Sequence, residues 1–317
     1  MINIKDYTII GIDGGGTKTR GVIFRDGKVQ SELVAGTTRI GAVGVGESCE
    51  RTLNVITELC NKSGIETGEV DAIVVGLAGV WLEEEKLRSR NLIKTLARSQ
   101  RTVINEILVT SDAEIALEGA FEGKDGIMTI VGTGSIALGK HKNHLYRCGG
   151  WGIELDDEGS GAWIGREGLT AVVRGLDGRG KMTVLAKEIE NMYPTINLTE
   201  PRTIVKAYAE RAFEYQNLTP SVMKCAADGD DICRDIINSA AQHLAELPAA
   251  IVKNFKSKPA DVALMGGIID ADTLLKNLLE NEIMKNNDLR LVKPKGSALD
   301  GAIAIGVKMI QNDIELE

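Results

Sequence analysis

The chain of 317 residues is long enough for two domains, and its 43% hydrophobic and 26% charged residues are typical of a globular protein. Its net charge is −8 at pH 7 and no block of Lys or Arg occurs, which disfavours nucleic acid and anionic membranes as partners. No apolar run reaches the ~20 residues that span a bilayer and no signal peptide is visible, so we expect a cytoplasmic protein. Five scattered cysteines without a CxxC pair predict reduced thiols rather than disulfides or a zinc site.

Strands and helices alternate in the predicted first half after an initial β-meander. Apolar and β-branched runs predict strands at residues 8–13, 20–25, 29–34, 71–79 and 106–110. A loop rich in Gly and Thr at 35–46 leads into the first of two amphipathic helices, at 47–63 and 82–99. This order indicates α/β layering.

The second half repeats the order. Strands are predicted between residues 127 and 146 and at 261–267, with a Gly-rich segment at 149–161. Helical patterns cover residues 162–174, 182–191, 201–216, 232–255 and 297–311.

A turn of glycine and hydroxyl residues between two apolar runs occurs twice, as Asp13-Gly-Gly-Gly-Thr-Lys-Thr19 and as Gly132-Thr-Gly-Ser135. Glycine has no Cβ, so backbone N–H groups can close on an anion, and the hydroxyl adds a donor. Extended residues rather than a helix follow each turn, which excludes a Walker loop and a Rossmann fingerprint. Either turn alone is a plain hairpin as an alternative. Two turns in matching contexts favour a clamp for a polyphosphate between duplicated halves.

Asp112 stands where the predicted strand 106–110 ends, and ligand clefts of open α/β sheets lie beyond the carboxyl ends of strands. A carboxylate at this position could accept the proton of a substrate hydroxyl that attacks a γ-phosphoryl group. The alternative is that Asp112 caps the helix that opens at Ala113. The residues alone leave both interpretations open.

Three consecutive carboxylates, Asp156-Asp157-Glu158, lie in the Gly-rich segment together with Trp151. They could bind a hard cation or accept hydrogen bonds from sugar hydroxyls. An exposed acidic loop is the alternative, but it explains neither the glycines nor Trp151. Gly266-Gly267 and residues 295–302 allow either close approach to a flat ligand such as adenine or close helix packing, and both interpretations stay open.

Five motifs in this order resemble the N-acetylglucosamine kinase group of the BadF/BadG/BcrA/BcrD ATPase family, within the superfamily of actin-like sugar kinases and chaperone ATPases; they are residues 13–19, 111–113, 131–135, 148–152 and 157–164. The resemblance spans nearly the whole chain. It implies two ribonuclease H-like α/β domains with mixed five-stranded sheets around a central cleft. We expect an N-terminal domain at 1–116, a larger C-terminal domain at 117–302, and a helix at about 303–317 that packs back onto the first domain.

The resemblance further implies Mg-ATP as cofactor, an amino sugar as substrate, a homodimer, and specific roles for single residues. Asp112 would be the general base for the O6 hydroxyl, and Asp13 would orient Mg2+ through water. The residues implied to bind ATP are Asp13, Gly15, Gly16, Thr17, Lys18, Gly132, Thr133, Gly134, Ser135, Ala226, Gly266 and Gly267. The residues implied to bind the sugar are Thr38, Arg39, Gly79, Asp112, Gly150, Trp151, Gly152, Asp157 and Glu158.

Two departures from the family pattern concern the sugar. Asp156 stands where the family usually has Gly, and the loop Thr37-Thr-Arg-Ile-Gly41 lacks an Asn that the family often carries. We expect phosphorylation of N-acetylglucosamine, with N-acetylmuramic acid as a second substrate. The alternatives are a glucosamine kinase, an ATPase that activates an iron–sulfur dehydratase or reductase, and a non-catalytic ATP-binding regulator. The activator would need a second cysteine in a Gly-rich turn beside Cys148, and the regulator would need a DNA-binding segment, for which residues 1–7 leave no room.

Overall fold

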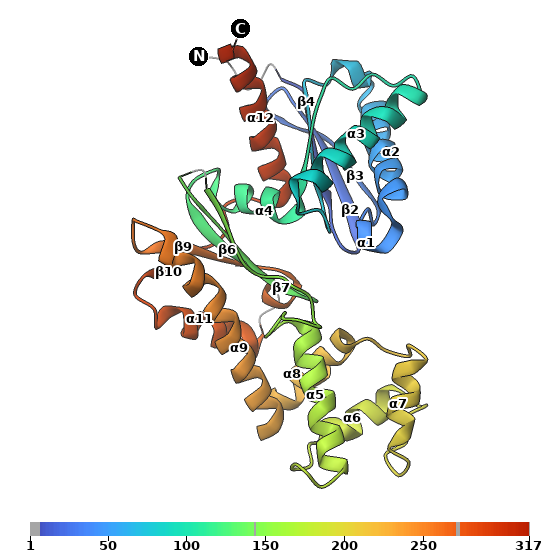
Figure 1. The fold of residues 1–317 in the computed structure, drawn as a ribbon, viewed down its shortest axis with the longest axis vertical. Coiled ribbons are helices and arrows are strands. Elements are labelled where there is room, and N and C mark those ends of the chain that lie inside the picture. Colours follow the sequence, from blue (N-terminus) through green and yellow to red (C-terminus); the bar gives the residue numbers. More distant parts are fainter. Residues whose placement is uncertain (1–6, 143, 271–272, 317) are drawn as a thin grey trace. The chain divides into compact units, whose positions relative to one another are not determined.

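The computed structural model describes residues 7–142, 144–270 and 273–316, so the outer ends of the predicted domains, at 1–6 and 317, lie outside the described residues. The chain forms two compact units, residues 1–124 with 294–317 and residues 125–293. Each unit contains a mixed five-stranded sheet, as predicted (Figure 1). The unit boundary follows helix α4 (Asp112–Phe121), whereas the boundary expected at 116 falls inside that helix. The returning helix is α12 (Ala298–Leu316), which begins before residue 303.

The sheet of the first unit has the strand order β3-β2-β1-β4-β5. Its strands are β1 (Ile9–Gly14), β2 (Lys18–Arg25), β3 (Lys28–Gly36), β4 (Ala72–Leu77) and β5 (Glu106–Ser111). The first three form an antiparallel meander, while β1, β4 and β5 run parallel. The carboxyl ends of β1 and β5 therefore flank the end of β4, which brings the segments after both strands to one edge.

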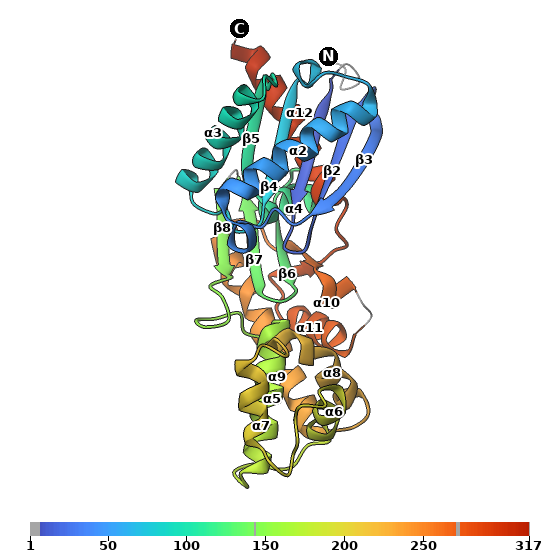
Figure 2. The ribbon, with the colours of Figure 1, turned by 90° about the vertical axis from the view of Figure 1, so that its right-hand side faces the viewer.

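Helices cover both faces of this sheet (Figures 1 and 2). Helices α2 (Val45–Ser63) and α3 (Glu83–Ser99) pack on one face over a core that includes Ile10 and Ile12, and α4 and α12 pack on the other. Gly11 points toward α12, where an added Cβ would lie 3.1 Å from the Cβ of Ala302. A Cβ on Gly301 would lie 1.9 Å from the carbonyl oxygen of Ile115. At residues 295–302 the structure thus confirms close helix packing.

The second unit repeats the same sheet order, β10-β9-β6-β7-β8, with β6, β7 and β8 antiparallel and β6, β9 and β10 parallel. Its strands are β6 (Gly126–Val131), β7 (Ser135–His141), β8 (His144–Gly149), β9 (Ala260–Met265) and β10 (Leu289–Leu291). Helix α9 (Asp231–Ile251) packs on this sheet and against α11 (Leu274–Met284). Helices α5 (Gly161–Leu176), α6 (Leu185–Met192), α7 (Arg202–Ala209) and α8 (Thr219–Ala227) form a helical layer that packs on α9, visible at the lower end of Figure 2.

Most predicted elements are confirmed, and the errors lie in the helical part of the second unit and in the loop after β3. The helix predicted at 201–216 is wrong, because α7 ends at Ala209 and Arg211 has a left-handed φ of 56°, after which the short helix η3 (Tyr215–Leu218) begins. Helices α8 and α11 and the short strand β10 were not predicted. The predicted loop 35–46 contains a short helix, α1 (Ile40–Val43).

Candidate active site

The first glycine turn joins β1 to β2 as a hairpin, as predicted, and its exposed tip is formed by Gly16, Thr17 and Lys18. The hydroxyl of Thr37 lies 3.0 Å from the carbonyl oxygens of both Gly15 and Gly16 and shares its one hydrogen between them. This contact holds the turn against the loop after β3. The hydroxyl of Thr17 and the ammonium group of Lys18 remain at the surface, where they can meet an anion.

Asp13 lies at the carboxyl end of β1, and its Oδ2 accepts a hydrogen bond of 2.9 Å from the guanidinium of Arg20. Arg20 is its antiparallel neighbour on β2. Mg2+ keeps several waters in proteins and takes one or two carboxylates together with substrate phosphates. Within the described ranges no group of three His, Cys, Asp or Glu side chains could hold a metal. Asp13 alone could therefore hold Mg2+ only together with water and the phosphate oxygens of a bound nucleotide.

Asp112 is the first residue of α4, directly after β5, and it does not cap the helix. The cap is Ser111, whose Oγ accepts the N–H of Glu114 at 3.1 Å, while the Glu114 carboxylate accepts the N–H of Ser111 at 3.5 Å. The capping alternative for Asp112 is therefore wrong. The Asp112 carboxylate accepts the N–H of Ala113, at 2.9 Å, and the backbone N–H of its own residue. One carboxylate is thus held at the edge of the sheet with spare acceptor capacity.

Burial raises the pKa of Asp112 to about 6, and the nearby negative charge of Asp13 adds to this rise. The N–H of Ala113 and the positive charge of Arg39 act in the opposite direction. Gly76 on β4 allows the close packing beside Asp112, because an added Cβ would lie 2.4 Å from the Cδ1 of Ile115 and 3.1 Å from the Cα of Asp112. A carboxyl group with a pKa near neutrality suits proton transfer at physiological pH.

An ion pair that sequence reasoning missed supports the start of α4. Lys86 of α3 donates to Glu114 at 2.9 Å and to Glu83 at 2.7 Å, with only 12% of its side chain exposed. Burial alone would lower the pKa of Lys86, but the two carboxylates raise it above its usual value. The Ser-x-x-Glu pattern at 111–114 is the signal that could have found Glu114.

The loop after β3 carries two predicted sugar contacts, one of which is buried and the other exposed. Thr38 is fully buried, since its hydroxyl accepts a hydrogen bond of 3.0 Å from Thr19 and its carbonyl accepts one of 2.6 Å from Ser48. Its side chain is therefore part of the interior and does not line a surface. Arg39 is exposed and lies close enough to Asp112 to affect its pKa. Gly79 is exposed beside this loop, with a left-handed φ of 88°.

The second glycine turn joins β6 to β7, also as predicted, and Thr133 is exposed at its tip. The carboxylate of Asp157 packs against this turn and accepts hydrogen bonds from the backbone N–H groups of Ser135 and Gly152. A Cβ added to Gly134 would lie 2.7 Å from the Oδ2 of Asp157. Burial raises the pKa of Asp157, and these N–H groups oppose the rise. Asp157 is 8% exposed. Its carboxylate therefore connects the turn to the Gly-rich segment.

The Gly-rich segment presents Trp151, which is 65% exposed, and the guanidinium of Arg147 lies 4.6 Å from the centroid of its ring. Gly150 and Gly152 have left-handed φ values of 75° and 89°, which expose the tryptophan on a tight turn. Glu158 pairs with His243 of α9 at 3.5 Å.

Asp156, the residue at which this chain departs from the family pattern, has a buried Oδ2 without a hydrogen-bond partner in the part of the chain that the structure describes. Buried polar atoms are normally bonded, so this oxygen is suited to a water or a ligand donor.

The three remaining predicted ATP contacts differ in accessibility. Gly266 approaches β6 so closely that a Cβ would lie 2.4 Å from the carbonyl oxygen of Val131, and its φ is 110°. Gly267 has open space around it at the start of the short helix α10 (Gly267–Asp270). Ala226 is fully buried in the core of the second unit, so its side chain cannot contact a bound nucleotide in this structure.

The model of the BadF/BadG/BcrA/BcrD ATPase family matches residues 10–306. The chain belongs to this ATPase family. The resemblance noted in the sequence is thereby confirmed.

Proteins similar in sequence to this chain include sugar kinases. The chain is 32% identical to an N-acetylmuramic acid/N-acetylglucosamine kinase of Clostridium acetobutylicum over 307 residues, 95% of this chain and 97% of the relative. It is 29% identical to an N-acetyl-D-glucosamine kinase of Dictyostelium discoideum over 294 residues, 87% of this chain and 90% of the relative. The crystal structure of a candidate N-acetylglucosamine kinase from Chromobacterium violaceum superposes with a TM-score of 0.76 at 25% identity, covering 94% of this chain and 98% of the other.

As a BadF/BadG/BcrA/BcrD family member with these relatives, the protein is an ATP-using sugar kinase of the N-acetylglucosamine kinase-like group, with the actin-like sugar kinase fold. This places the protein among the kinases rather than the iron–sulfur activators considered from the sequence. No helix within the described ranges is both long and apolar enough to cross a bilayer.

Proposed function

We propose that the enzyme transfers the γ-phosphate of ATP to the O6 hydroxyl of N-acetylglucosamine and also accepts N-acetylmuramic acid. The observation that carries this proposal is the Asp112 carboxylate, which directly follows β5, does not cap α4 and has a pKa raised to about 6. The names of the two kinases above support N-acetylated hexosamines as the substrate class. The exposed Arg39 beside Asp112 supports an anionic substituent on the sugar, because guanidinium groups bind carboxylates through paired hydrogen bonds.

In this proposal Asp112 accepts the proton of the O6 hydroxyl as that oxygen attacks the γ-phosphorus. The backbone and hydroxyl donors of the turns at 14–18 and 132–135 bind phosphate oxygens. Asp13 holds Mg2+ through water, and the bound ion neutralises phosphate charge during transfer. Trp151 offers its exposed ring face to the sugar, and Asp157 keeps the segment that carries Trp151 attached to the second turn.

A homodimer and a cytoplasmic location complete the proposal. The location is supported by the reaction, because ATP is supplied to sugar kinases in the cytoplasm. Sedimentation of the purified protein tests the dimer directly, since a monomer at micromolar concentration would contradict it.

A coupled assay that measures ADP release tests the substrate. It is run with Mg-ATP against N-acetylglucosamine, N-acetylmuramic acid, glucosamine and glucose, and each product is examined for the position of the phosphate. The proposal expects turnover of the two N-acetylated sugars with phosphate on O6. Preferred turnover of glucosamine, or phosphate on another oxygen, would contradict it.

A further inference from the structure

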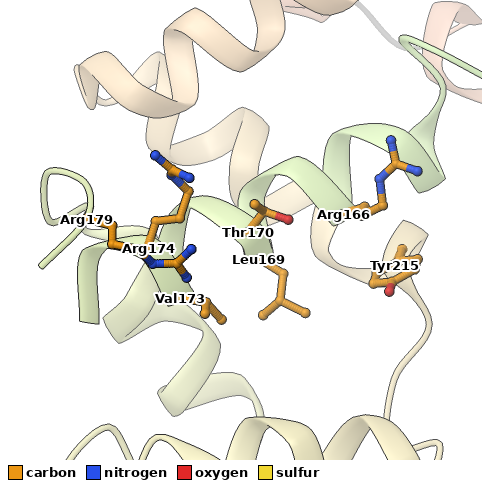
Figure 3. Close-up of a pocket in the computed structure, with 7 residues that line it drawn as sticks. All are labelled: Arg166, Leu169, Thr170, Val173, Arg174, Arg179 and Tyr215. Atoms are coloured by element: carbon orange, nitrogen blue, oxygen red, sulfur yellow. The ribbon is translucent and has the colours of Figure 1, made fainter. Parts of the chain in front are cut away.

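A cavity of about 240 Å³ lies in the helical layer of the second unit, and none of its lining residues belongs to the proposed ATP or sugar contacts. Helix α5, the turn after it and η3 form its walls. Figure 3 shows Arg166 and Tyr215 at one end, Arg174 and Arg179 at the other, and Leu169 between them. The cavity is therefore a separate candidate binding site.

The floor of the cavity is apolar. Leu169 is 9% exposed, Val173 is half-buried, and the ring of Tyr215 stacks on Tyr208 with 5.1 Å between the ring centroids. Small-molecule sites typically combine such a surface with a few convergent polar groups. An aromatic ring held in place by a neighbouring ring offers a flat face to the C–H groups of a ligand.

The rim of the cavity is cationic, with three guanidinium groups and no carboxylate among the lining residues. Two of the three are neutralised from outside the cavity: Arg166 pairs with Glu167 at 3.3 Å and Arg179 pairs with Asp177 at 2.5 Å. Arg174 has neither an ion pair nor a side-chain hydrogen bond within the described part of the chain. One positive charge at this rim is thus available to a ligand.

We propose that this cavity binds a sugar phosphate, with the phosphate on Arg174 and Arg179 and the sugar ring over Leu169 and Tyr215. A guanidinium fork matches the oxygens of a phosphate monoester through two parallel hydrogen bonds. The apolar floor has no partner for a second charge, which favours a ligand with one anionic end. The choice of a sugar phosphate rests on the proposed function, because the kinase reaction forms a molecule of this class.

Helix α5 connects the cavity to both predicted binding segments of the second unit. Arg166 donates a hydrogen bond of 3.0 Å to the carbonyl oxygen of Ile153, within the Gly-rich segment that carries Trp151. The first residues of α5 donate to the carbonyl oxygens of Gly132 and Thr133, at 2.8 and 3.0 Å. A ligand that engages the rim at Arg166 can therefore alter the sugar segment, and coupling of the two sites would be reciprocal in binding free energy.

The test is calorimetric titration of N-acetylglucosamine 6-phosphate into the full-length protein saturated with N-acetylglucosamine, so that the proposed sugar site is occupied. Wild type is compared with Arg174→Ala and with Arg234→Ala, a control that removes an exposed arginine of α9 outside the cavity. The loss of a hydrogen bond to a charged group predicts binding weaker by about 10- to 100-fold for Arg174→Ala. The control is expected to bind like the wild type.

Equal binding by wild type and Arg174→Ala, or none by the wild type, overturns the proposal. Affinity for inorganic phosphate equal to that for the sugar phosphate overturns the assignment of the ring to the apolar floor. Arg179→Ala, expected to weaken binding at the same rim, keeps the test valid if Arg174→Ala does not fold. Absence of turnover with every sugar would refute the proposed function. The titration with Arg174→Ala measures binding alone, so its result does not depend on turnover.

Discussion

The ammonium group of Lys86 lies 2.9 Å from a carboxylate oxygen of Glu114, and this ion pair joins α3 to the first turn of α4. Both side chains are largely buried, at 12% and 14% exposed. Glu114 also forms the capping box with Ser111, the residue before Asp112. The pair therefore supports the first turn of α4, which carries the proposed base.

Replacement of Lys86 by Met should destabilise the protein and lower kcat. Removing one partner of a largely buried pair leaves the other charge without compensation, which costs about 3–5 kcal/mol in fully buried cases and less here. A several-fold fall in kcat with little change in the sugar KM is expected, because the α4 start is displaced rather than the sugar contacts. Arg88→Met, at an exposed position of the same helix, is the control. A normal kcat in a destabilised Lys86→Met enzyme would limit the pair to a structural role.

The pH dependence of kcat/KM should follow the ionisation of Asp112. The base is active when it is deprotonated, so activity should fall as pH drops through about 6, where its pKa lies. Because Arg39 holds this pKa down, Arg39→Ala should move the acidic limb to higher pH. A limb that stays at the same pH in this variant would mean that Asp112 is not the titrating group. The measurement is a set of initial rates over a pH series at low sugar concentration.

The two glycine turns should act on the same nucleotide. Substitution of Thr17 or Thr133 by Val removes a hydroxyl donor from an exposed tip and is expected to weaken Mg-ATP binding by about 1–3 kcal/mol. The double variant should be non-additive, as is expected of groups that share one ligand. Calorimetric titration of a non-hydrolysable ATP analogue gives the three values. Strict additivity, or an unchanged Kd in either single variant, would argue against a shared phosphate site.

Arg39 should distinguish the two N-acetylated sugars. N-acetylmuramic acid carries a lactyl carboxylate, and a guanidinium that binds it contributes about 1.5–3 kcal/mol. Arg39→Ala should therefore raise the KM for N-acetylmuramic acid by about 10- to 100-fold and leave the KM for N-acetylglucosamine nearly unchanged. Arg98→Ala, an exposed arginine of α3, serves as control. Equal changes for both sugars would show that Arg39 does not read the lactyl group.

The sequence predicted the parts of this molecule that depend on local chemistry. Both hairpin turns and the position of Asp112 after β5 follow from glycine, hydroxyl and apolar patterns within about ten residues, whereas the two five-stranded sheets were expected from the family resemblance. Features that depend on distant partners could not be predicted. Thr38, in the loop after β3, is buried against Thr19 of β2, which donates a hydrogen bond to it, and Ala226 is buried because α8 packs into the core.

The end of α7 at Ala209 could not be predicted from hydrophobic periodicity either. Residues 201–216 have a continuous helical pattern, but Arg211 adopts a left-handed conformation at a position without the glycine that usually marks one. The Lys86 ion pair was missed for a similar reason, because Lys86 and Glu114 are 28 positions apart and lie on different helices.

A test of Asp112 as the general base needs a variant that still folds. Asp112→Asn should fold and should be more stable than the wild type near pH 7, by about 1–3 kcal/mol. The sign follows from the raised pKa: ionisation of the folded carboxyl group is unfavourable above about pH 6, and Asn removes that cost. Below the pKa of the unfolded chain the carboxyl group is neutral in both states, so the gain should vanish. Asp228→Asn, at an exposed position, should show no such gain.

The most direct test is the single-turnover rate of Asp112→Asn with Mg-ATP and N-acetylglucosamine, measured beside the sugar Kd. Asn keeps the size and most hydrogen bonds of Asp but cannot accept the proton. A general base contributes about 10²–10⁴-fold, so the rate should fall by at least that factor while the sugar Kd changes little. A folded Asp112→Asn enzyme that phosphorylates the sugar at a near-normal rate would show that Asp112 is not the general base.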